Sequence, residues 1–184
     1  MILKVWFCLG DVQEIEQTIS GGSIMNKVFR GFLIGTVLAA GLSAVALTAA
    51  APDPVVGTWT LNVAKSKFTP GPAPKSQTRT YTESAQGTTL TFKGVAADGS
   101  SMSGQSTFKY DGSDYPITGS RNYDTLSLKR LNGSTVRGTL KRGGKVVGAA
   151  IRAISAHGKV LTLSTKVTDA KGVRYDDVAV FDRQ

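Results

Sequence analysis

The residues of this sequence whose types and spacing could bind a ligand are Arg79 and Tyr81, which stand two apart. On an extended strand, alternate side chains point to the same face, so the guanidinium and the phenol would lie close together. They could hold a carboxylate by a bidentate and a hydroxyl hydrogen bond. If Thr78, Thr80 and Thr82 face solvent, the pair faces the interior. The alternative is an outward arginine beside an ordinary β-forming tyrosine.

Other reactive side chains are few. The one histidine, His157, falls in a glycine-containing turn, and the one cysteine, Cys8, lies near the N-terminus. Nucleophilic catalysis needs a histidine oriented by a carboxylate, and zinc sites usually draw on several histidines or cysteines. We therefore expect a protein that is not an enzyme and has no catalytic residue, no metal site and no cofactor.

The aspartates do not form a second candidate site. Asp176 and Asp177 are adjacent, so on a strand they face opposite sides and cannot act together on one substrate bond. The run at residues 111–114, Asp-Gly-Ser-Asp, is shorter than an EF-hand loop and lacks its closing glutamate. We interpret it as a tight turn.

Residues 25–50 have the pattern of a secretory signal peptide. Lys27 and Arg30 precede an apolar run from Phe32 to Leu47, and small residues follow up to Ala50. We expect cleavage near Ala50 and an exported product, periplasmic or secreted, without an integral membrane segment after processing. An uncleaved anchor is disfavoured, because about 16 apolar and small residues fall short of the roughly 20 that span a bilayer.

Residues 1–24 precede the charged start of that signal peptide. We interpret them as an upstream over-read or a disordered extension, because they match no targeting pattern; a genuine extension is the alternative. They contain Cys8, so residues 51–184 have no cysteine and are expected to form no disulfide.

Residues 51–184 are strongly basic. Nineteen lysines and arginines stand against ten aspartates and glutamates, so this domain carries the whole formal net charge of +9. Such a charge favours anionic partners, including acidic envelope components or a carboxylate ligand. Nucleic acid is not expected, because the basic residues are scattered and not interleaved with stacking aromatics. The cations expected on outer strand faces are Lys93, Lys129, Arg137, Lys141 and Lys166.

The same domain shows the pattern of an all-β fold. Turn-forming pairs recur at short intervals, and the segments between them alternate with a period of two. Strands are predicted at residues 56–62, 77–84, 87–95, 102–110, 124–131, 134–142, 145–154, 159–168 and 173–182. A meander this long has two open edges unless it closes, so we predict one antiparallel up-and-down β-barrel of eight to ten strands. The proline-rich residues 69–74 should form a long irregular connection across one end.

Gly57-Thr58-Trp59 opens the first predicted strand. In a meander of this length it resembles the Gly-x-Trp signature of the lipocalin and fatty-acid-binding-protein superfamily. Residues 57–68, 72–81, 110–112 and 115–119 are similar to a bacterial group of exported, lipocalin-like proteins of unassigned function. Avidin-like barrels share the triplet, but their biotin pocket uses several tryptophans, and Trp59 is the only one in residues 51–184. The resemblance implies a lipocalin-like barrel.

The resemblance also implies roles for individual residues. Trp59 should plug the closed end, covered by an arginine from the end of the last strand; Arg183 has that position, with Arg79 as competitor. In fatty-acid-binding proteins an Arg-x-Tyr pair on the final strand holds the ligand carboxylate. Here that stretch reads Ala-Val-Phe at residues 179–181, and the Arg79–Tyr81 pair stands on another strand.

The inner faces decide whether a ligand fits. We expect a ligand tail to contact Leu128, Val136, Leu140 and Ile151. Small Gly138 and Ala149 on the same faces leave volume, although a filled core is nearly as compatible with an eight-strand barrel.

Two functional hypotheses follow. The first is a non-enzymatic binding protein that carries or senses a small amphipathic or apolar ligand in its barrel. The second is a basic scaffold that binds anionic envelope components through its outer face.

Overall fold

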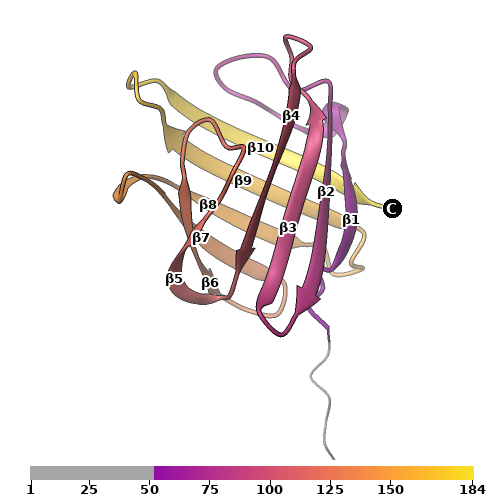
Figure 1. Ribbon diagram of the computed structural model, residues 1–184. Coiled ribbons are helices and arrows are strands. Elements are labelled where there is room, and N and C mark those ends of the chain that lie inside the picture. The colour runs from indigo at the N-terminus through magenta and orange to yellow at the C-terminus, as the bar shows by residue number, and fades with distance from the viewer. Residues whose placement is uncertain (1–51) are drawn as a thin grey trace, which may run out of the picture. The chain divides into compact units, whose positions relative to one another are not determined.

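The computed structural model describes residues 52–184, which form ten strands and one turn of 3-10 helix (Figure 1). The predictions for residues 1–24 and for the signal peptide at 25–50 lie outside the described residues. Within 52–184, no helix is long and apolar enough to cross a membrane. The strands are β1 (Gly57–Leu61), β2 (Ser76–Ser84), β3 (Gly87–Val95), β4 (Ser101–Phe108), β5 (Asp111–Pro116), β6 (Thr125–Arg130), β7 (Thr135–Arg142), β8 (Lys145–Ile154), β9 (Val160–Thr168) and β10 (Arg174–Arg183).

The strands form one antiparallel sheet in the order β4-β3-β2-β1-β10-β9-β8-β7-β6-β5. Every pair of consecutive strands is hydrogen-bonded except β4 and β5, which are the two edges of the sheet, and β1 also pairs with β10 and so joins the two halves of the meander. In Figure 1, strands β1 to β4 cross in front of strands β7 to β10 at a steep angle. The prediction of an all-β, antiparallel, up-and-down barrel is confirmed.

The barrel is nearly closed where its two edge strands, β4 and β5, meet. The connection after β5 crosses to β4: the Thr118 amide donates to the Gln105 carbonyl at 2.9 Å, and the Ser106 hydroxyl donates to the Pro116 carbonyl at 2.8 Å. Gly119 packs against the β4 backbone so closely that a Cβ there would lie 1.9 Å from the Ser103 carbonyl oxygen. The segment at residues 117–124 therefore completes the wall.

The structure has one strand more than the nine predicted ranges, and this additional strand is β5. The interpretation of residues 111–114 as a tight turn is therefore wrong, because Asp111 pairs with Lys129 and Asp114 pairs with Ser127. The register shifts between these two pairs, as in a β-bulge, and Gly112 has a φ of +84°. The turn-like composition thus reflects a bulge inside a strand.

One end of the barrel is sealed around Trp59, which is 0% exposed. Its indole Nε1 donates to the Val55 carbonyl at 2.8 Å, and the Arg183 guanidinium carbon lies 4.2 Å from the ring centre. Arg183 also donates to the Pro54 and Val56 carbonyls. Its role as the cover of Trp59 is confirmed in place of Arg79. Gly57 leaves room for it, because a Cβ there would lie 2.6 Å from Arg183 Nη1.

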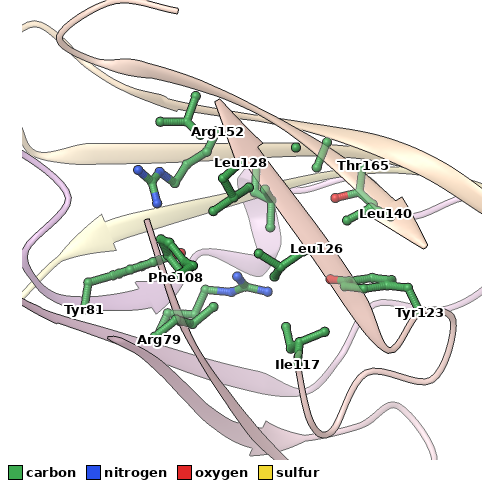
Figure 2. Close-up of a pocket in the computed structure, with 15 residues that line it drawn as sticks. Arg79, Tyr81, Phe108, Ile117, Tyr123, Leu126, Leu128, Leu140, Arg152 and Thr165 are labelled. Carbon is green, nitrogen blue, oxygen red and sulfur yellow. The ribbon is translucent and has the colours of Figure 1, made fainter. Parts of the chain in front are cut away.

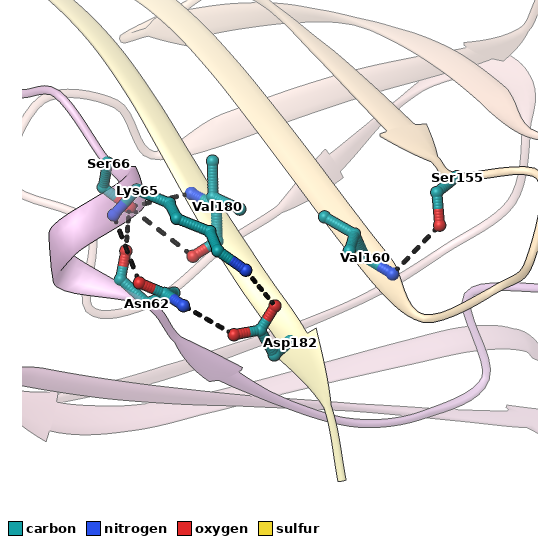
Figure 3. Close-up of polar contacts among 7 residues, drawn as sticks. All are labelled: Asn62, Lys65, Ser66, Ser155, Val160, Val180 and Asp182. Atoms are coloured by element: carbon teal, nitrogen blue, oxygen red, sulfur yellow. Dashed lines mark hydrogen bonds and ion pairs between the residues drawn. The ribbon is translucent and has the colours of Figure 1, made fainter.

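The chain leaves β1 through the 3-10 turn η1 (Val63–Lys65), which is attached to β10 (Figure 3). Asn62 Nδ2 donates to Asp182 Oδ2 at 2.6 Å, and the Ser66 hydroxyl accepts from the Val180 amide at 2.9 Å. The chain then runs through residues 70–75 outside any strand, as predicted for the proline-rich stretch. These contacts fix the long connection against the last strand.

Because neighbouring strands are antiparallel, the connections alternate between the two ends. Those after β2, β4, β6 and β8 lie at the sealed end with Trp59. Those after β3, β5, β7 and β9 lie at the opposite end, with the proline-rich residues 70–75. We call this second end the distal end.

Candidate functional site

The interior of the barrel holds a cavity of about 60 Å³ (Figure 2). Five of the six residues predicted to contact a ligand line this cavity: Arg79, Tyr81, Leu128, Val136 and Leu140. Arg79 and Tyr81 therefore face inward, which is the first of the two alternatives that the sequence left open. Of the two small residues expected to leave volume, Gly138 lines the cavity and Ala149 does not.

The prediction that the sixth residue, Ile151, faces the interior is wrong. Ile151 is 38% exposed and does not line the cavity. In β8 the inward residues are Ala150 and Arg152, because Arg152 stands opposite inward Val136 on β7 and Leu163 on β9. Residues directly opposite each other in an antiparallel pair share a face, which puts Ile151 outside.

Arg152 is a charged residue of the cavity wall that the sequence pattern did not predict. It is only 7% exposed, and its Nη2 donates to the Tyr110 hydroxyl at 2.7 Å. Its guanidinium carbon lies 5.3 Å from the ring centres of both Tyr81 and Tyr110. Its Nε atom is buried with no hydrogen-bond partner among the described residues. A buried donor without an acceptor costs roughly 1–3 kcal/mol, so the burial of Nε without a partner has to be explained.

Arg152 stays charged in this environment. Burial works against its charged form, but Tyr81, Tyr110 and Asp53 together raise the pKa of Arg152 above its usual value. The interior of the barrel therefore contains a permanent positive charge.

Arg79 places a second guanidinium on the cavity wall. It is half-buried, its Nε donates to Gln77 Oε1 at 3.2 Å, and its guanidinium carbon lies 5.7 Å from the Phe92 ring and 5.4 Å from the Phe181 ring. Figure 2 shows both Arg79 and Arg152 reaching in from opposite walls. Among the described residues, the contacts of the two guanidinium groups are aromatic rings, the Tyr110 hydroxyl and the Gln77 amide oxygen.

Asp53, whose charge acts on Arg152, has other hydrogen-bond partners. Asp53 Oδ2 accepts from Arg130 Nη2 at 2.6 Å, and Asp53 Oδ1 accepts from the Val55 amide at 3.0 Å. Burial opposes ionisation of Asp53, but these bonds and one from Tyr110 lower its pKa. No ion pair joins Arg79 or Arg152 to any carboxylate of residues 52–184.

The size of the cavity limits what the site can hold in this conformation. A cavity of about 60 Å³ takes a few water molecules or one carboxylate group, whereas drug-sized ligands occupy pockets of roughly 300–1,000 Å³. Its walls toward the distal end are formed by Ile117 and half-buried Tyr123 from residues 117–124, and by half-buried Thr165 on β9. The arrangement is suited to binding an anion.

The remaining polar candidates lie apart from this cavity. His157 is exposed in the turn between β8 and β9. Asp176 pairs with Lys166 at 3.0 Å, and Asp177 accepts from the Thr69 amide at 3.0 Å, so the two aspartates have separate partners.

A scan against protein-family models finds no family that matches this chain, and a search of curated proteins finds no relative. The nearly closed, ten-stranded antiparallel barrel is compatible with a calycin-like fold.

Proposed function

We propose that this protein is an exported, non-enzymatic, lipocalin-like binding protein that carries or senses a small amphipathic carboxylate inside its barrel. The observation that carries the proposal is the pair of inward arginines, Arg79 and Arg152, without a carboxylate partner in residues 52–184. The exported location, periplasmic or secreted, rests on the signal-peptide pattern of residues 25–50.

The energetics favour an anionic guest. A buried charge is costly unless it is paired and hydrogen-bonded, and Arg152 has only one hydrogen-bond partner among the described residues, the Tyr110 hydroxyl. A ligand carboxylate would give the unpartnered Nε an acceptor and would balance the two guanidinium charges. Tyr81, between them on the cavity wall, could donate its hydroxyl to the same group.

The apolar part of the ligand would lie against Leu128, Val136 and Leu140. Because the cavity is small, a chain of several carbons must displace Ile117 or Tyr123 toward the distal end. We therefore expect short- and medium-chain carboxylates to bind more readily than long-chain ones.

Calorimetry with a series of saturated fatty acids tests this function. The parent should give heat, and Arg79→Met and Arg152→Met should each weaken binding about tenfold or more, the loss expected for a charge-assisted hydrogen bond. Arg137→Met is the matched control, because Arg137 is exposed on the outer face of β7. No heat from the parent, or equal binding by all four proteins, would contradict the carrier function.

The alternative function, a basic scaffold for anionic envelope components, has less support. Two of its five expected outer-face cations are paired with acids: Lys141 with Asp114 at 2.8 Å, and Lys166 with Asp176 at 3.0 Å. Exposed ion pairs of this kind reduce the local positive potential. The scaffold hypothesis would be favoured if the protein bound an acidic matrix while no fatty acid bound the barrel.

A further inference from the structure

Two neighbouring hairpins at the distal end carry exposed aliphatic side chains. Val146 follows the β7–β8 turn and is 65% exposed; Val173 precedes β10 and is 38% exposed. The inner strands of these hairpins, β8 and β9, pair with each other up to Gly148 and Val167. Figure 1 shows both hairpins projecting at the left of the barrel. An aliphatic side chain on a projecting tip gains nothing from the protein's own core.

Both tips are also basic. Lys145 adjoins Val146, while Lys171 and Arg174 flank the β9–β10 turn; all three are exposed. None of the three forms an ion pair with a carboxylate within residues 52–184. Each tip therefore has an exposed cation that is adjacent in sequence to its exposed valine and is not ion-paired within residues 52–184.

Two aspartates at these turns offset part of this charge; the amides of Val173 and Lys171 and the nearby Lys171 ammonium lower the pKa of Asp169. Asp169 Oδ1 accepts from the amides of Lys171 and Val173 at 2.8 and 2.9 Å. Asp124 Oδ2 accepts from the Gly143 amide at 2.9 Å. The three exposed cations outnumber these two carboxylates, so the tips keep a net positive charge.

We propose that the tips of the β7–β8 and β9–β10 hairpins dock on an anionic phospholipid surface. Val146 and Val173 enter the boundary between head groups and acyl chains, and Lys145, Lys171 and Arg174 contact the lipid phosphates. Aliphatic side chains surrounded by unpaired cations match that boundary, where an apolar layer lies directly beneath negative charge. An anionic polysaccharide would match the cations and leave the valines in water.

The docking surface lies at the same end as the less buried part of the cavity wall. Tyr123 and Thr165 line the cavity and are only half-buried, whereas Trp59 and Phe181 seal the other end with 0% exposure. A docked barrel would thus turn its less buried end toward the bilayer. The docking does not depend on the interior anion site, so each can fail without the other.

Vesicle co-sedimentation tests the proposal. The protein recovered after export is mixed with vesicles of phosphatidylcholine alone or of phosphatidylcholine with phosphatidylglycerol. We expect preferential, salt-sensitive binding to the anionic vesicles. Loss of one lysine or arginine contact should weaken binding about fivefold, the equivalent of about 1 kcal/mol per cation at an anionic surface.

Matched variants separate docking from general charge and apolarity. Lys145→Glu, Lys171→Glu and the double change of Val146 and Val173 to Asp should weaken binding. The controls at the sealed end are Lys159→Glu and Leu131→Asp; Lys159 is exposed, and Leu131 is 56% exposed. All variants are made in the same full-length chain, so any contribution from other residues is common to all. Because every substituted side chain is exposed, folding should be preserved, and thermal unfolding checks it.

A second measurement reports insertion directly. Val146→Trp should give a blue-shifted emission on anionic vesicles, while Leu131→Trp should not, and buried Trp59 adds a constant background. Three results would overturn the proposal: no vesicle binding, equal binding to both vesicle types, or equal weakening by the sealed-end controls. Retention on dextran sulfate without vesicle binding would also overturn it and assign an anionic polymer as the partner.

Discussion

Replacing Arg152 with methionine should weaken ligand binding about tenfold or more without unfolding the protein. Methionine keeps much of the side-chain length and removes the charge. Arg152 is 7% exposed, so an arginine serving only the fold would be expected to cost several kcal/mol when truncated. The contacts of Arg152 in the structure indicate a much smaller net cost.

The contributions to stability nearly cancel. The variant loses the 2.7 Å bond to the Tyr110 hydroxyl, about 1.5–3 kcal/mol, and two cation–π contacts of about 0.5–1 kcal/mol each. It no longer buries the guanidinium, which removes a desolvation penalty of several kcal/mol that includes the cost of the unpartnered Nε. Without ligand, the free energy of unfolding should fall by no more than about 1 kcal/mol, the two sums being of similar size.

Urea denaturation followed by Trp59 fluorescence measures this balance, with and without the fatty acid that binds best. At a ligand concentration about 100-fold above the Kd of the parent, the parent should gain about 2.7 kcal/mol, and a variant that binds tenfold more weakly or worse should gain no more than about 1.4 kcal/mol. Arg137→Met should behave as the parent does in both conditions. A loss of about 3 kcal/mol or more in unliganded Arg152→Met would refute the reasoning, because it would show that the arginine is structural.

Three further predictions concern the fold. Trp59→Ala should lower the free energy of unfolding by about 3–5 kcal/mol in urea, because it empties a fully buried aromatic site; a loss below about 0.5 kcal/mol, as at a surface site, would contradict this. Asp53→Asn should cost about 1–3 kcal/mol at neutral pH. Because the pKa of Asp53 is lowered in the folded protein, its contribution to stability is present above the pKa of the unfolded state and is lost as pH falls through the pKa of the folded state. The free energies of unfolding of the two proteins should therefore converge in acid. A difference that stays constant with pH would contradict the ion pair of Asp53 with Arg130. Ile151→Ser should change stability by less than about 0.5 kcal/mol, as for a surface site, whereas Leu140→Ser should cost about 2–5 kcal/mol, as for a core deletion; equal losses would place Ile151 inside.

The sequence pattern predicted the barrel because most strands alternate clearly. Val136, Gly138 and Leu140 line the interior of β7 and stand between exposed or half-buried residues, so their period of two also fixes their face. Trp59 and Arg183 followed from the resemblance, and they stand directly opposite each other in the β1–β10 pair.

The face of β8 could not be read from its own residues. Gly148, Ala149 and Ala150 are small on both faces, so the choice rested on Ile151 against Arg152, and hydrophobicity favoured the wrong one. The register with Val136 and Leu163 decides the face, and a register across strands is not visible in one strand. Knowing which residues of neighbouring strands pair would have shown that Arg152 faces the interior.

The small size of the cavity also could not be predicted from the sequence alone. Gly138 does leave space, but Leu128 Cδ2 approaches to 3.0 Å from where a Cβ would stand, so the neighbour fills most of it. Packing of this kind depends on side chains from several strands, which alternation alone does not describe.

The central claim is that two interior guanidinium groups hold a ligand carboxylate in its ionised form. Nuclear magnetic resonance of fatty acid labelled with ¹³C at the carboxyl carbon tests it most directly, through a pH titration of the bound signal in the parent and in Arg152→Met. A carboxyl group in water has a pKa of about 4, and the bound group should titrate well below that, because both arginines favour its charged form. A bound signal that titrates as the free acid does, or that is unchanged in Arg152→Met, would contradict the claim.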